Sequence, residues 1–209
     1  MIVIIDYGMG NVRSVLNAFE VCGAPVELSA EPARIASAKG IVLPGVGAFG
    51  DGMRLLRERG LVEVIKTEVS IRNKPFLGLC VGMQLLASHG TEHGESEGLG
   101  LFPGIVELVP LPPDRTDLKL PHIGWNTVTF RKTDGLFKGM GRQADFYFVH
   151  SYAMVPVDRS VVAGECEHGT PVVAAVEQAN IWATQFHPEK SHRNGLALLR
   201  NWIEKVASC

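Results

Sequence analysis

The sequence lacks a long hydrophobic run and any excess of charge of one sign. Its 209 residues carry 20 Lys and Arg against 22 Asp and Glu, a formal net charge of −2. Such a balance offers no electrostatic attraction for nucleic acid or an anionic membrane. The apolar start, MIVII, is too short for a signal-peptide core or a membrane span. We therefore expect neither nucleic acid nor membrane as a partner, and a location in the cytoplasm.

Cysteine is also scarce, and no CxxC pair is present. The sequence therefore shows no zinc or disulfide framework, and free thiols in a reducing compartment are the simplest expectation. The four cysteines are Cys22, Cys80, Cys166 and Cys209. A glycine-broken loop, HGTEHGESE, offers other metal-binding side chains, but their spacing fits no closed site. We expect that loop to be solvated and the protein to use no metal or cofactor; the side chains concerned are His89, Glu92, His93 and Glu95.

The first half of the chain alternates short apolar runs with helical patterns. Residues 1–5, 40–44 and 75–79 are typical of buried strands, and residues 12–22 and 51–70 have helical spacing, the second with Asp51 as its N-cap. A third helical pattern starts at Val81. This alternation predicts right-handed βαβ units. The fold class is therefore α/β, with a mostly parallel central sheet flanked by helices, and residues 1–209 suffice for a single domain.

The second half is rich in strand patterns with short connections, which predict antiparallel strands that extend the sheet or form a small second one. These patterns span residues 104–109, 125–130, 145–152, 160–166 and 171–178. A final helix is expected from Gly195 to about Ala207. The polar stretches 89–98 and 110–119 are expected to be surface loops.

The segment GLCVG, residues 78–82, has the form of a nucleophile elbow with cysteine at its centre. Gly78 and Gly82 permit a tight strand-to-helix turn, which would expose Cys80 at the carboxyl end of the sheet. A helix starting there favours the thiolate, and the Val81 N–H is placed to receive an oxyanion. A lone cysteine is more often a core residue, but this context favours a nucleophile over a core thiol.

A cysteine nucleophile needs a base and a group that orients the base. His187 and Glu189 follow the strand-like run IWATQF. Side chains two residues apart in an extended chain point to the same side, so Glu189 can bind one ring nitrogen of His187. His187 would take and return the proton while Glu189 fixes its tautomer. The alternative is a surface histidine beside an unrelated acid.

The glycine loop PGVGAFG, residues 44–50, contains a literal G-x-G-x-x-G. A dinucleotide site would also need an acid at the end of the next strand, whereas Glu68 falls inside a helical pattern. We favour the alternative that Gly45, Val46 and Gly47 pass beside Cys80 and form the second wall of an oxyanion hole.

The motifs GLCVGMQ, PGVG and QFHPE together resemble the triad-class (class I) glutamine amidotransferases, whose flavodoxin-like domain has the same order of cysteine, histidine and glutamate. Within that class, DYGMGN, PHIGWN, YFVHSY and QFHPEKS resemble the glutaminase subunits of imidazole glycerol phosphate synthases. The resemblance covers essentially the whole chain. One departure is Val81, where leucine is common; because this residue contributes its N–H, the exchange should matter little.

The resemblance implies a glutaminase of histidine biosynthesis. Its catalytic residues would be Cys80, His187 and Glu189, which release ammonia from glutamine through a thioester. The ammonia would pass to a (β/α)8-barrel cyclase, the partner in a heterodimer. That partner would make imidazole glycerol phosphate and an aminoimidazole-carboxamide ribonucleotide. An enclosed route for ammonia from the glutaminase to the cyclase is physically reasonable, because ammonia released into water would be protonated and diluted.

The resemblance also assigns residues around the triad. It places the oxyanion hole at Val46 and Val81. It places the glutamine pocket at Gly45, Gly47, Gln84, Glu92, Ser151 and Tyr152. It places the contact with the cyclase at Asn11, Trp125, Tyr147 and Lys190.

Three other functions are compatible with parts of the pattern. They are a glutaminase serving another synthase, such as those for anthranilate, GMP or carbamoyl phosphate, a cysteine hydrolase or peptidase on a similar sheet, and a binding module without activity. PHIGWN and DYGMGN argue against the first, Gln84 and the PGVG segment against the second, and an intact set of Cys80, His187 and Glu189 against the third.

Overall fold

A nine-stranded sheet forms the centre of the computed structural model, which describes residues 1–208; Cys209 lies outside the described residues. The strand order is β2-β1-β3-β4-β13-β12-β11-β8-β9. The first strands in this order, from β2 to β13, run parallel, and the rest are antiparallel. The parallel strands are β1 (Ile2–Ile5), β2 (Val26–Ser29), β3 (Gly40–Gly45), β4 (Phe76–Cys80) and β13 (Ile181–Thr184). The antiparallel strands are β8 (His122–Phe130), β9 (Gln143–His150), β11 (Val162–Glu167) and β12 (Pro171–Gln178).

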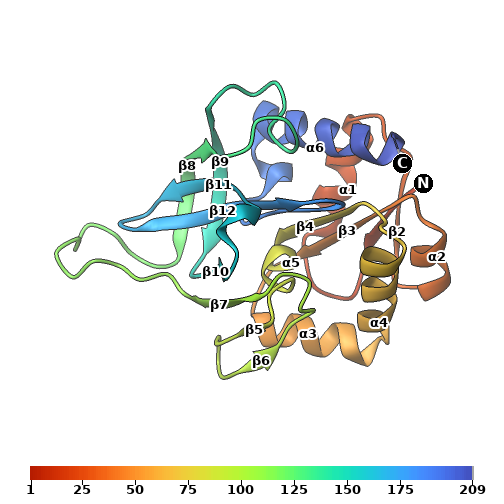
Figure 1. Cartoon of the computed structure of the whole chain (residues 1–209), viewed down its shortest axis with the longest axis horizontal. Coiled ribbons are helices and arrows are strands. Elements are labelled where there is room, and N and C mark those ends of the chain that lie inside the picture. Colours follow the sequence, from red (N-terminus) through yellow and green to blue (C-terminus); the bar gives the residue numbers. More distant parts are fainter. Residues whose placement is uncertain (209) are drawn as a thin grey trace.

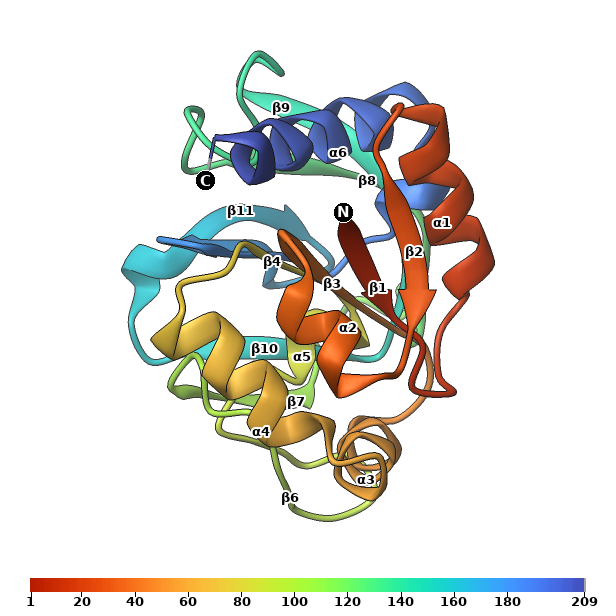
Figure 2. The ribbon, with the colours of Figure 1, turned by 90° about the vertical axis from the view of Figure 1, so that its right-hand side faces the viewer.

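Helices cover both faces of the parallel part of this sheet, as the sequence predicts for an α/β fold (Figure 1). One face is packed by α1 (Val12–Val21) and α6 (His192–Ala207), where Trp202 meets Phe19 edge to face at 5.8 Å. The other face is packed by α2 (Pro32–Ser37), α3 (Phe49–Glu58) and α4 (Leu61–Lys66) (Figure 2). The predicted core side of the last helix is confirmed, since Leu198, Leu199, Trp202 and Val206 are buried.

A second, four-stranded sheet has the order β10-β7-β5-β6 and lies beside α3 and α5 (Val81–Gln84). Its strands are β5 (His89–Gly90), β6 (Ser96–Glu97), β7 (Gly104–Leu108) and β10 (Tyr152–Pro156). The chain passes from the first sheet to the second at Ser151, between β9 and β10, so the predicted strand 145–152 is two strands. The prediction of a plain loop over 89–98 was wrong because two short strands pair there with each other and with β7.

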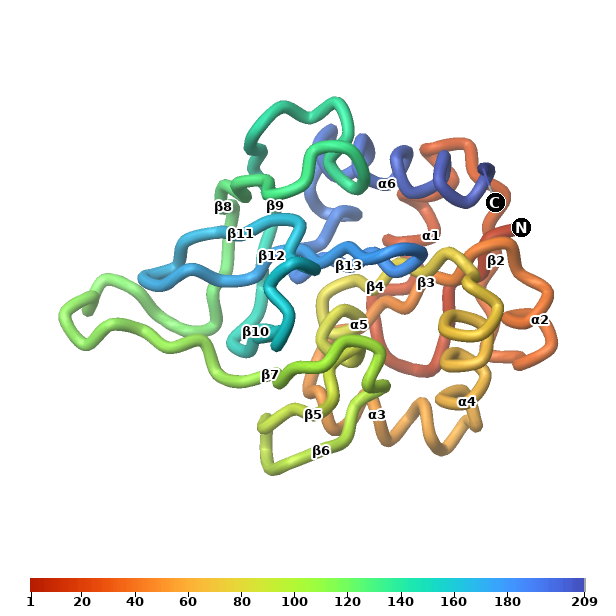
Figure 3. Tube along the Cα trace, in the orientation of Figure 1, coloured from red at the N-terminus to blue at the C-terminus, as the bar shows by residue number. Residues whose placement is uncertain are grey.

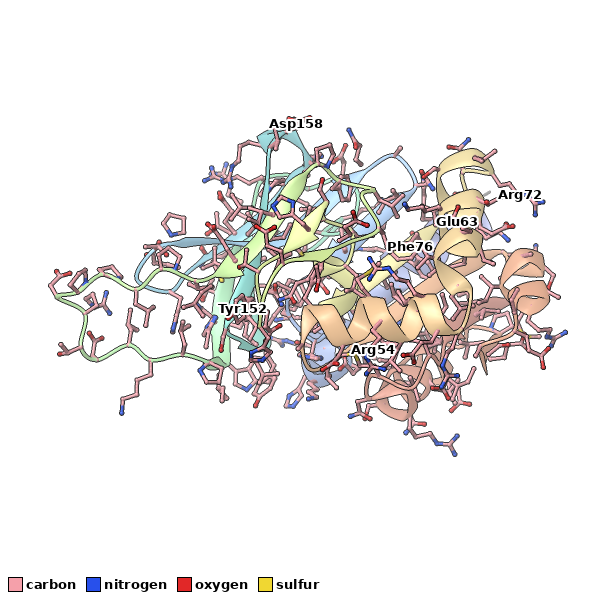
Figure 4. All side chains as sticks on the ribbon, turned by 90° about the horizontal axis from the view of Figure 1, so that it is seen from below. Arg54, Glu63, Arg72, Phe76, Tyr152 and Asp158 are labelled. Atoms are coloured by element: carbon pink, nitrogen blue, oxygen red, sulfur yellow. The ribbon has the colours of Figure 1, made fainter. Side chains whose placement is uncertain are left out.

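The predicted helix 51–70 is also divided. Gly60 adopts a left-handed conformation, with φ +67°, and separates α3 from α4; a five-residue π-helical turn, Thr67–Ile71, follows. The helix begins at Phe49, after Ala48, so Asp51 lies in its first turn instead of capping it. On the outer face of α3, Arg54 bridges Asp51 and Glu58 (Figure 4). A single helical period could not reveal the break, because glycine is also tolerated inside helices.

The strand β13 enters the sheet between β4 and β12, although it is the last strand among residues 1–208 (Figure 3). Thr184 pairs with Leu79 in the parallel register, which brings the ends of β4 and β13 together. Short 3₁₀ turns, Arg159–Val161 and Pro188–Lys190, complete the described elements. No helix among residues 1–208 is long and apolar enough to cross a membrane.

Candidate functional site

Cys80 occupies a strained turn between β4 and α5. Its backbone has φ +53° and ψ −110°, a region that residues with a side chain rarely adopt. The turn is crowded from behind: a Cβ on Gly82 would lie 1.8 Å from the Leu43 carbonyl oxygen, and one on Gly78 would lie 2.7 Å from the Gly82 carbonyl oxygen. Only glycine fits at either position, and the close packing of β3, β4 and α5 holds Cys80 in the strained conformation.

The helix that follows is shorter than the sequence pattern indicates. α5 spans only Val81–Gln84, and Leu85 ends it. One helical turn has a small dipole, so less stabilisation of a thiolate comes from it than from a full helix. The Val81 N–H remains important, because the first residue of a helix has no intrahelical acceptor for its N–H.

His187 and Glu189 form a buried pair at the end of β13. The Nδ1–H of His187 donates to Oε1 of Glu189 at 2.8 Å, and the two side chains are only 3% and 2% exposed. The pair is not formed along an extended chain as expected. His187 has extended backbone angles, but Glu189 lies in the 3₁₀ turn Pro188–Lys190, which brings its carboxylate back to the ring.

The backbone of His187 is fixed by a hydrogen-bond cluster. Its N–H donates to the Tyr147 carbonyl at 2.9 Å, and its own carbonyl accepts from the Ser191 hydroxyl at 2.6 Å. Ser191 in turn accepts from the Tyr147 N–H at 3.0 Å. Ser191 was not identified from the sequence, where it has the pattern of an ordinary residue before the last helix.

The electrostatics favour a protonated His187. Burial acts to lower its pKa, but Cys80 and the Glu189 carboxylate outweigh burial and raise the pKa to about 10. Nε2, the nitrogen opposite the one bound to Glu189, is buried without a hydrogen-bond partner among residues 1–208. His187 and Cys80 line the same cavity. An imidazole held this way can exchange a proton with a group bound beside Cys80.

The other described cysteines lie in different surroundings. Cys166, on β11, is buried, and burial raises the pKa of its thiol to about 12. Cys22 is half-buried at the end of α1, and burial raises its pKa too. Neither lines the cavity that contains Cys80. Of the cysteines in residues 1–208, Cys80 alone combines a strained backbone with a neighbouring histidine.

That cavity has a volume of about 140 Å³, which is small beside the roughly 300–1,000 Å³ of sites for drug-sized ligands. It brings together residues that the sequence analysis selected from five separate segments. The predicted residues that line it are Val46, Gly47, Cys80, Val81, Gln84, Glu92, Ser151, Tyr152 and His187. Val149 and His150 line it as well and were not predicted. The cavity suits a small metabolite.

Gly45 does not line the cavity but lies directly behind its wall. It pairs with Cys80 in the β3–β4 register, and a Cβ there would lie 2.8 Å from Cβ of Val81 and 2.9 Å from the hydroxyl of Tyr7. Val46 and Gly47 follow as exposed residues at the cavity edge, and Gly47 has φ +102°. Tyr7 is fully buried, and its hydroxyl has no partner among the described residues.

Two glutamine side chains connect the Tyr152 carbonyl to Cys80. Nε2 of Gln84 donates to the Tyr152 carbonyl at 2.8 Å and to Oε1 of Gln185 at 3.1 Å. Nε2 of Gln185 lies 3.8 Å from Sγ of Cys80. Gln185 was missed in the sequence because the QFHPE motif was interpreted only for its histidine and glutamate. Tyr152 is labelled in the view of the side chains from below (Figure 4).

Glu92 is the acid of the 88–97 loop that reaches the cavity. Its Oε2 accepts from the Phe49 N–H at 2.9 Å, at the start of α3, where Ala48 offers no side-chain cap. The neighbouring His89, His93 and Glu95 are exposed. Among residues 1–208, no group of three or more histidine, cysteine or acidic side chains is placed to hold a metal ion.

Three of the residues predicted to contact a partner lie together at the surface, the exposed Trp125 and the half-buried Tyr147 and Lys190. Trp125 on β8 is 49% exposed and meets Tyr147 on β9 at 6.1 Å between ring centroids, and Nζ of Lys190 lies 5.9 Å above the Tyr147 ring. Ile123, on the same face of β8, is 60% exposed. Asn11 is exposed and caps α1 through the Ser14 N–H at 3.4 Å.

Comparisons with known proteins agree with this geometry. The family model for class-I glutamine amidotransferases matches residues 3–206. HisH subunits of imidazole glycerol phosphate synthase are 47% identical to this chain in Moorella thermoacetica (98% of this chain, 95% of the relative) and 49% identical in Aquifex aeolicus (98% and 96%).

Solved structures with lower identity share the fold alone. One is a putative GMP synthase protein from Thermoplasma acidophilum, with TM-score 0.75 and 20% identity over 99% of this chain and 94% of that one. Another is PurLQS from Thermotoga maritima, with TM-score 0.76 and 19% identity over 98% of each chain. From the full-length family match and the close relatives, the chain belongs to the class-I glutamine amidotransferases and, within them, to the HisH subunit family of imidazole glycerol phosphate synthase.

Proposed function

We propose that this chain is the glutaminase subunit of an imidazole glycerol phosphate synthase in histidine biosynthesis. It hydrolyses glutamine to glutamate and ammonia and passes the ammonia to a (β/α)8-barrel cyclase, all in the cytoplasm. The observation that carries the proposal is the placement of Cys80, on a strained turn, in one small cavity with the buried His187–Glu189 pair.

The first chemical step is attack by the Cys80 thiolate on Cδ of the glutamine side chain. A C–S bond forms, and the carbonyl oxygen becomes an oxyanion. Backbone N–H groups of Val81 and Val46 are the proposed donors to this oxygen, one from each wall of the cavity. Support comes from the position of Val81 at the start of α5 and from the pairing of Gly45 with Cys80, which brings the next residue, Val46, to the cavity edge.

The second step breaks the C–N bond. His187, protonated on Nε2, donates that proton to the leaving nitrogen, so ammonia departs and the thioester remains. His187 then removes a proton from water, which attacks the thioester carbon, and the thiolate leaves as glutamate forms. Glu189 holds the ring through Nδ1–H and stabilises the charge that His187 carries before the first transfer and again after the second.

The remaining cavity residues are assigned to substrate binding. Gln84 and the main chain of Ser151 and Tyr152 form one wall, and Glu92 is positioned to attract the ammonium group of glutamine. Its carboxylate already accepts one N–H, from Phe49, and retains lone pairs for a second donor. Gly45 and Gly47 keep the opposite wall close to the substrate.

The partner surface is assigned to the exposed Trp125, Ile123 and Asn11, together with the half-buried Tyr147 and Lys190. Exposed aromatic and aliphatic side chains beside a site are typical of a protein interface. Lys190 follows Glu189 directly, and Tyr147 binds the backbone of His187, so the surface borders the catalytic pair. A cyclase seated there would receive ammonia without its release to water.

The test is glutamate release from glutamine by the chain alone and with the barrel cyclase and its nucleotide acceptor. Cys80→Ala removes the proposed nucleophile, and Cys166→Ala is the matched control, a buried cysteine outside the cavity. We expect strong stimulation by cyclase and acceptor, loss in Cys80→Ala and retention in Cys166→Ala. A rate of hydrolysis that is the same with and without cyclase and acceptor would refute the assignment of the partner. Equal activity of the two variants would refute the assignment of Cys80 as the nucleophile.

A further inference from the structure

Two buried histidines outside the triad form a hydrogen-bonded chain that ends in the cavity wall. His150, the last residue of β9, lines the cavity, and its Nε2 lies 3.1 Å from Nδ1 of His122 on β8. Nδ1 of His150 lies 2.9 Å from the Tyr152 carbonyl oxygen. At the other end, Nε2 of His122 lies 3.2 Å from Nδ2 of Asn126. The chain therefore links Asn126, next to the exposed Trp125, with Tyr152.

The terminal groups assign a direction to every bond in this chain. A carbonyl only accepts, so Nδ1 of His150 carries a proton and donates to Tyr152. The amide nitrogen of Asn126 only donates, to Nε2 of His122 and to the Glu167 carbonyl at 2.8 Å, while its oxygen accepts from the Thr127 N–H at 2.8 Å. His122 must then carry its proton on Nδ1 and donate it to Nε2 of His150. Both rings are neutral Nδ1–H tautomers.

The surroundings of the two rings keep them neutral. Burial, joined by the neighbouring His150 and His168, lowers the pKa of His122 to about 3. Burial lowers the pKa of His150 to about 4 against the hydrogen bond to Tyr152, with His168 and His187 acting in the same direction as burial. His122 is stacked between Phe148, at 4.8 Å, and His168, at 4.1 Å.

The hydrogen bond from His150 to the Tyr152 carbonyl spans Ser151, the residue at which the chain passes from the large sheet to the small one. Ser151 separates β9 of the large sheet from β10 of the small one, and its carbonyl accepts from the Val109 N–H at 2.9 Å. The Tyr152 carbonyl accepts from His150 on one side and from Gln84, at 2.8 Å, on the other. Both of its lone pairs are thus occupied by groups of the cavity wall.

We propose that His150, oriented by His122 and Asn126, is a positioning residue that sets the main chain of Ser151 and Tyr152 for glutamine binding. This inference rests on the proposed function of the cavity. It assigns His150 no proton transfer, because both of its ring nitrogens are already engaged. Its effect is on the shape of the substrate wall and not on the nucleophile.

Two substitutions at His150 separate positioning from mere packing. Asparagine carries an N–H where His150 has Nδ1, and can therefore still donate to the Tyr152 carbonyl. Glutamine carries its amide one carbon further and cannot occupy that place. We expect His150→Gln to displace the main chain of Ser151 and Tyr152 and His150→Asn to keep it largely in place. This order is the reverse of the one that packing alone would give, because glutamine is larger than asparagine and closer in volume to histidine.

The readout compares two reagents that alkylate Cys80 in the full chain. Iodoacetamide requires only a reactive thiolate, whereas an electrophile built on the glutamine skeleton also requires the substrate wall. We expect His150→Gln to lower the rate with the glutamine analogue at least tenfold, His150→Asn to restore it to within about threefold of wild type, and iodoacetamide rates to stay within twofold in both. Equal losses in both variants, or parallel losses with both reagents, would overturn the proposal.

A spectroscopic measurement tests the tautomers without any reference to activity. Long-range ¹H–¹⁵N spectra of the chain labelled in histidine report which ring nitrogen carries the proton. We expect His122 and His150 to be Nδ1–H tautomers from pH 8 down to pH 5. In Asn126→Asp the carboxylate only accepts, so we expect a proton on Nε2 of His122. An Nε2–H tautomer in the wild type would overturn the proposal; failure of both reagents to label Cys80 would instead refute the proposed nucleophile.

Discussion

Replacement of Glu189 by glutamine would separate the two effects of its carboxylate on His187, orientation of the ring and stabilisation of its charge. Oε1 accepts from Nδ1–H at 2.8 Å, whereas Oε2 is buried without a partner among the described residues. A glutamine in the same rotamer can keep its oxygen on Nδ1–H and place its NH2 where Oε2 now lies. The tautomer of His187 is then preserved, and only the negative charge is lost.

The size of the effect follows from that geometry. A hydrogen bond to a charged group contributes roughly 1.5–3 kcal/mol, and a neutral one about 1 kcal/mol. At 1.36 kcal/mol for each factor of ten in rate, we expect kcat to fall roughly three- to thirty-fold. Loss of the tautomer as well would cost far more, about 10⁴-fold in serine-protease triads.

The assay is glutamate release at saturating glutamine in the presence of cyclase and acceptor, with the thermal midpoint measured in parallel. Glu204→Gln is the matched control, since the Glu204 side chain is 65% exposed on α6 and pairs with Lys138 at the surface. An unchanged rate in Glu189→Gln would mean that the charge is not used. A loss near 10⁴-fold would mean that the amide turned its NH2 towards His187. Either result would refute the reasoning.

Three further predictions concern stability, measured by urea unfolding. Tyr7→Phe removes a buried hydroxyl without a partner and should raise the free energy of unfolding by about 1 kcal/mol; a decrease would reveal a partner for it. Lys74→Met removes one of the two cations paired with the buried Glu68 carboxylate, at 2.8 Å, and leaves Arg72 at 2.7 Å, so it should cost about 2 kcal/mol, whereas Lys138→Met at the surface should cost under about 1 kcal/mol. Folding raises the pKa of His187, so protonation of this ring stabilises the folded chain. That contribution to the free energy of unfolding is complete below pH 6.5 and is lost as pH rises towards about 10, by at most about 1.4 kcal/mol per pH unit. Glu189→Gln should flatten this slope, and an unchanged slope would assign it to another group.

Much of the α/β architecture could be predicted because strand and helix periods are local properties. MIVII and PFLGL became β1 and β4 almost residue for residue, and the antiparallel patterns both extended the large sheet and formed a small one. The break at Gly60 and the short length of α5 could not be predicted. Both depend on how the segment packs against the rest of the fold, which overrides a periodic pattern.

The candidate site was predictable where residue type and spacing carry the chemistry. Cys80, His187 and Glu189 are brought together by the pairing of β4 with β13, and Glu92 alone of its loop reaches the cavity. Gln185 and His150 were missed because their roles depend on partners 105 and 28 residues away in the sequence, respectively. Such contacts leave no periodic signal in one sequence.

The position of β13 also has a consequence for how the protein acquires reactivity during synthesis. The strand that leads to His187 fits between β4 and β12, so it can join only after all residues up to β13 have left the ribosome. Until then, β4 is paired with β3 alone, and Cys80 lacks its histidine. Closing so long a loop is slow compared with local pairing. A growing chain that has not yet added β13 and His187 should therefore not hydrolyse glutamine, because Cys80 has no base beside it.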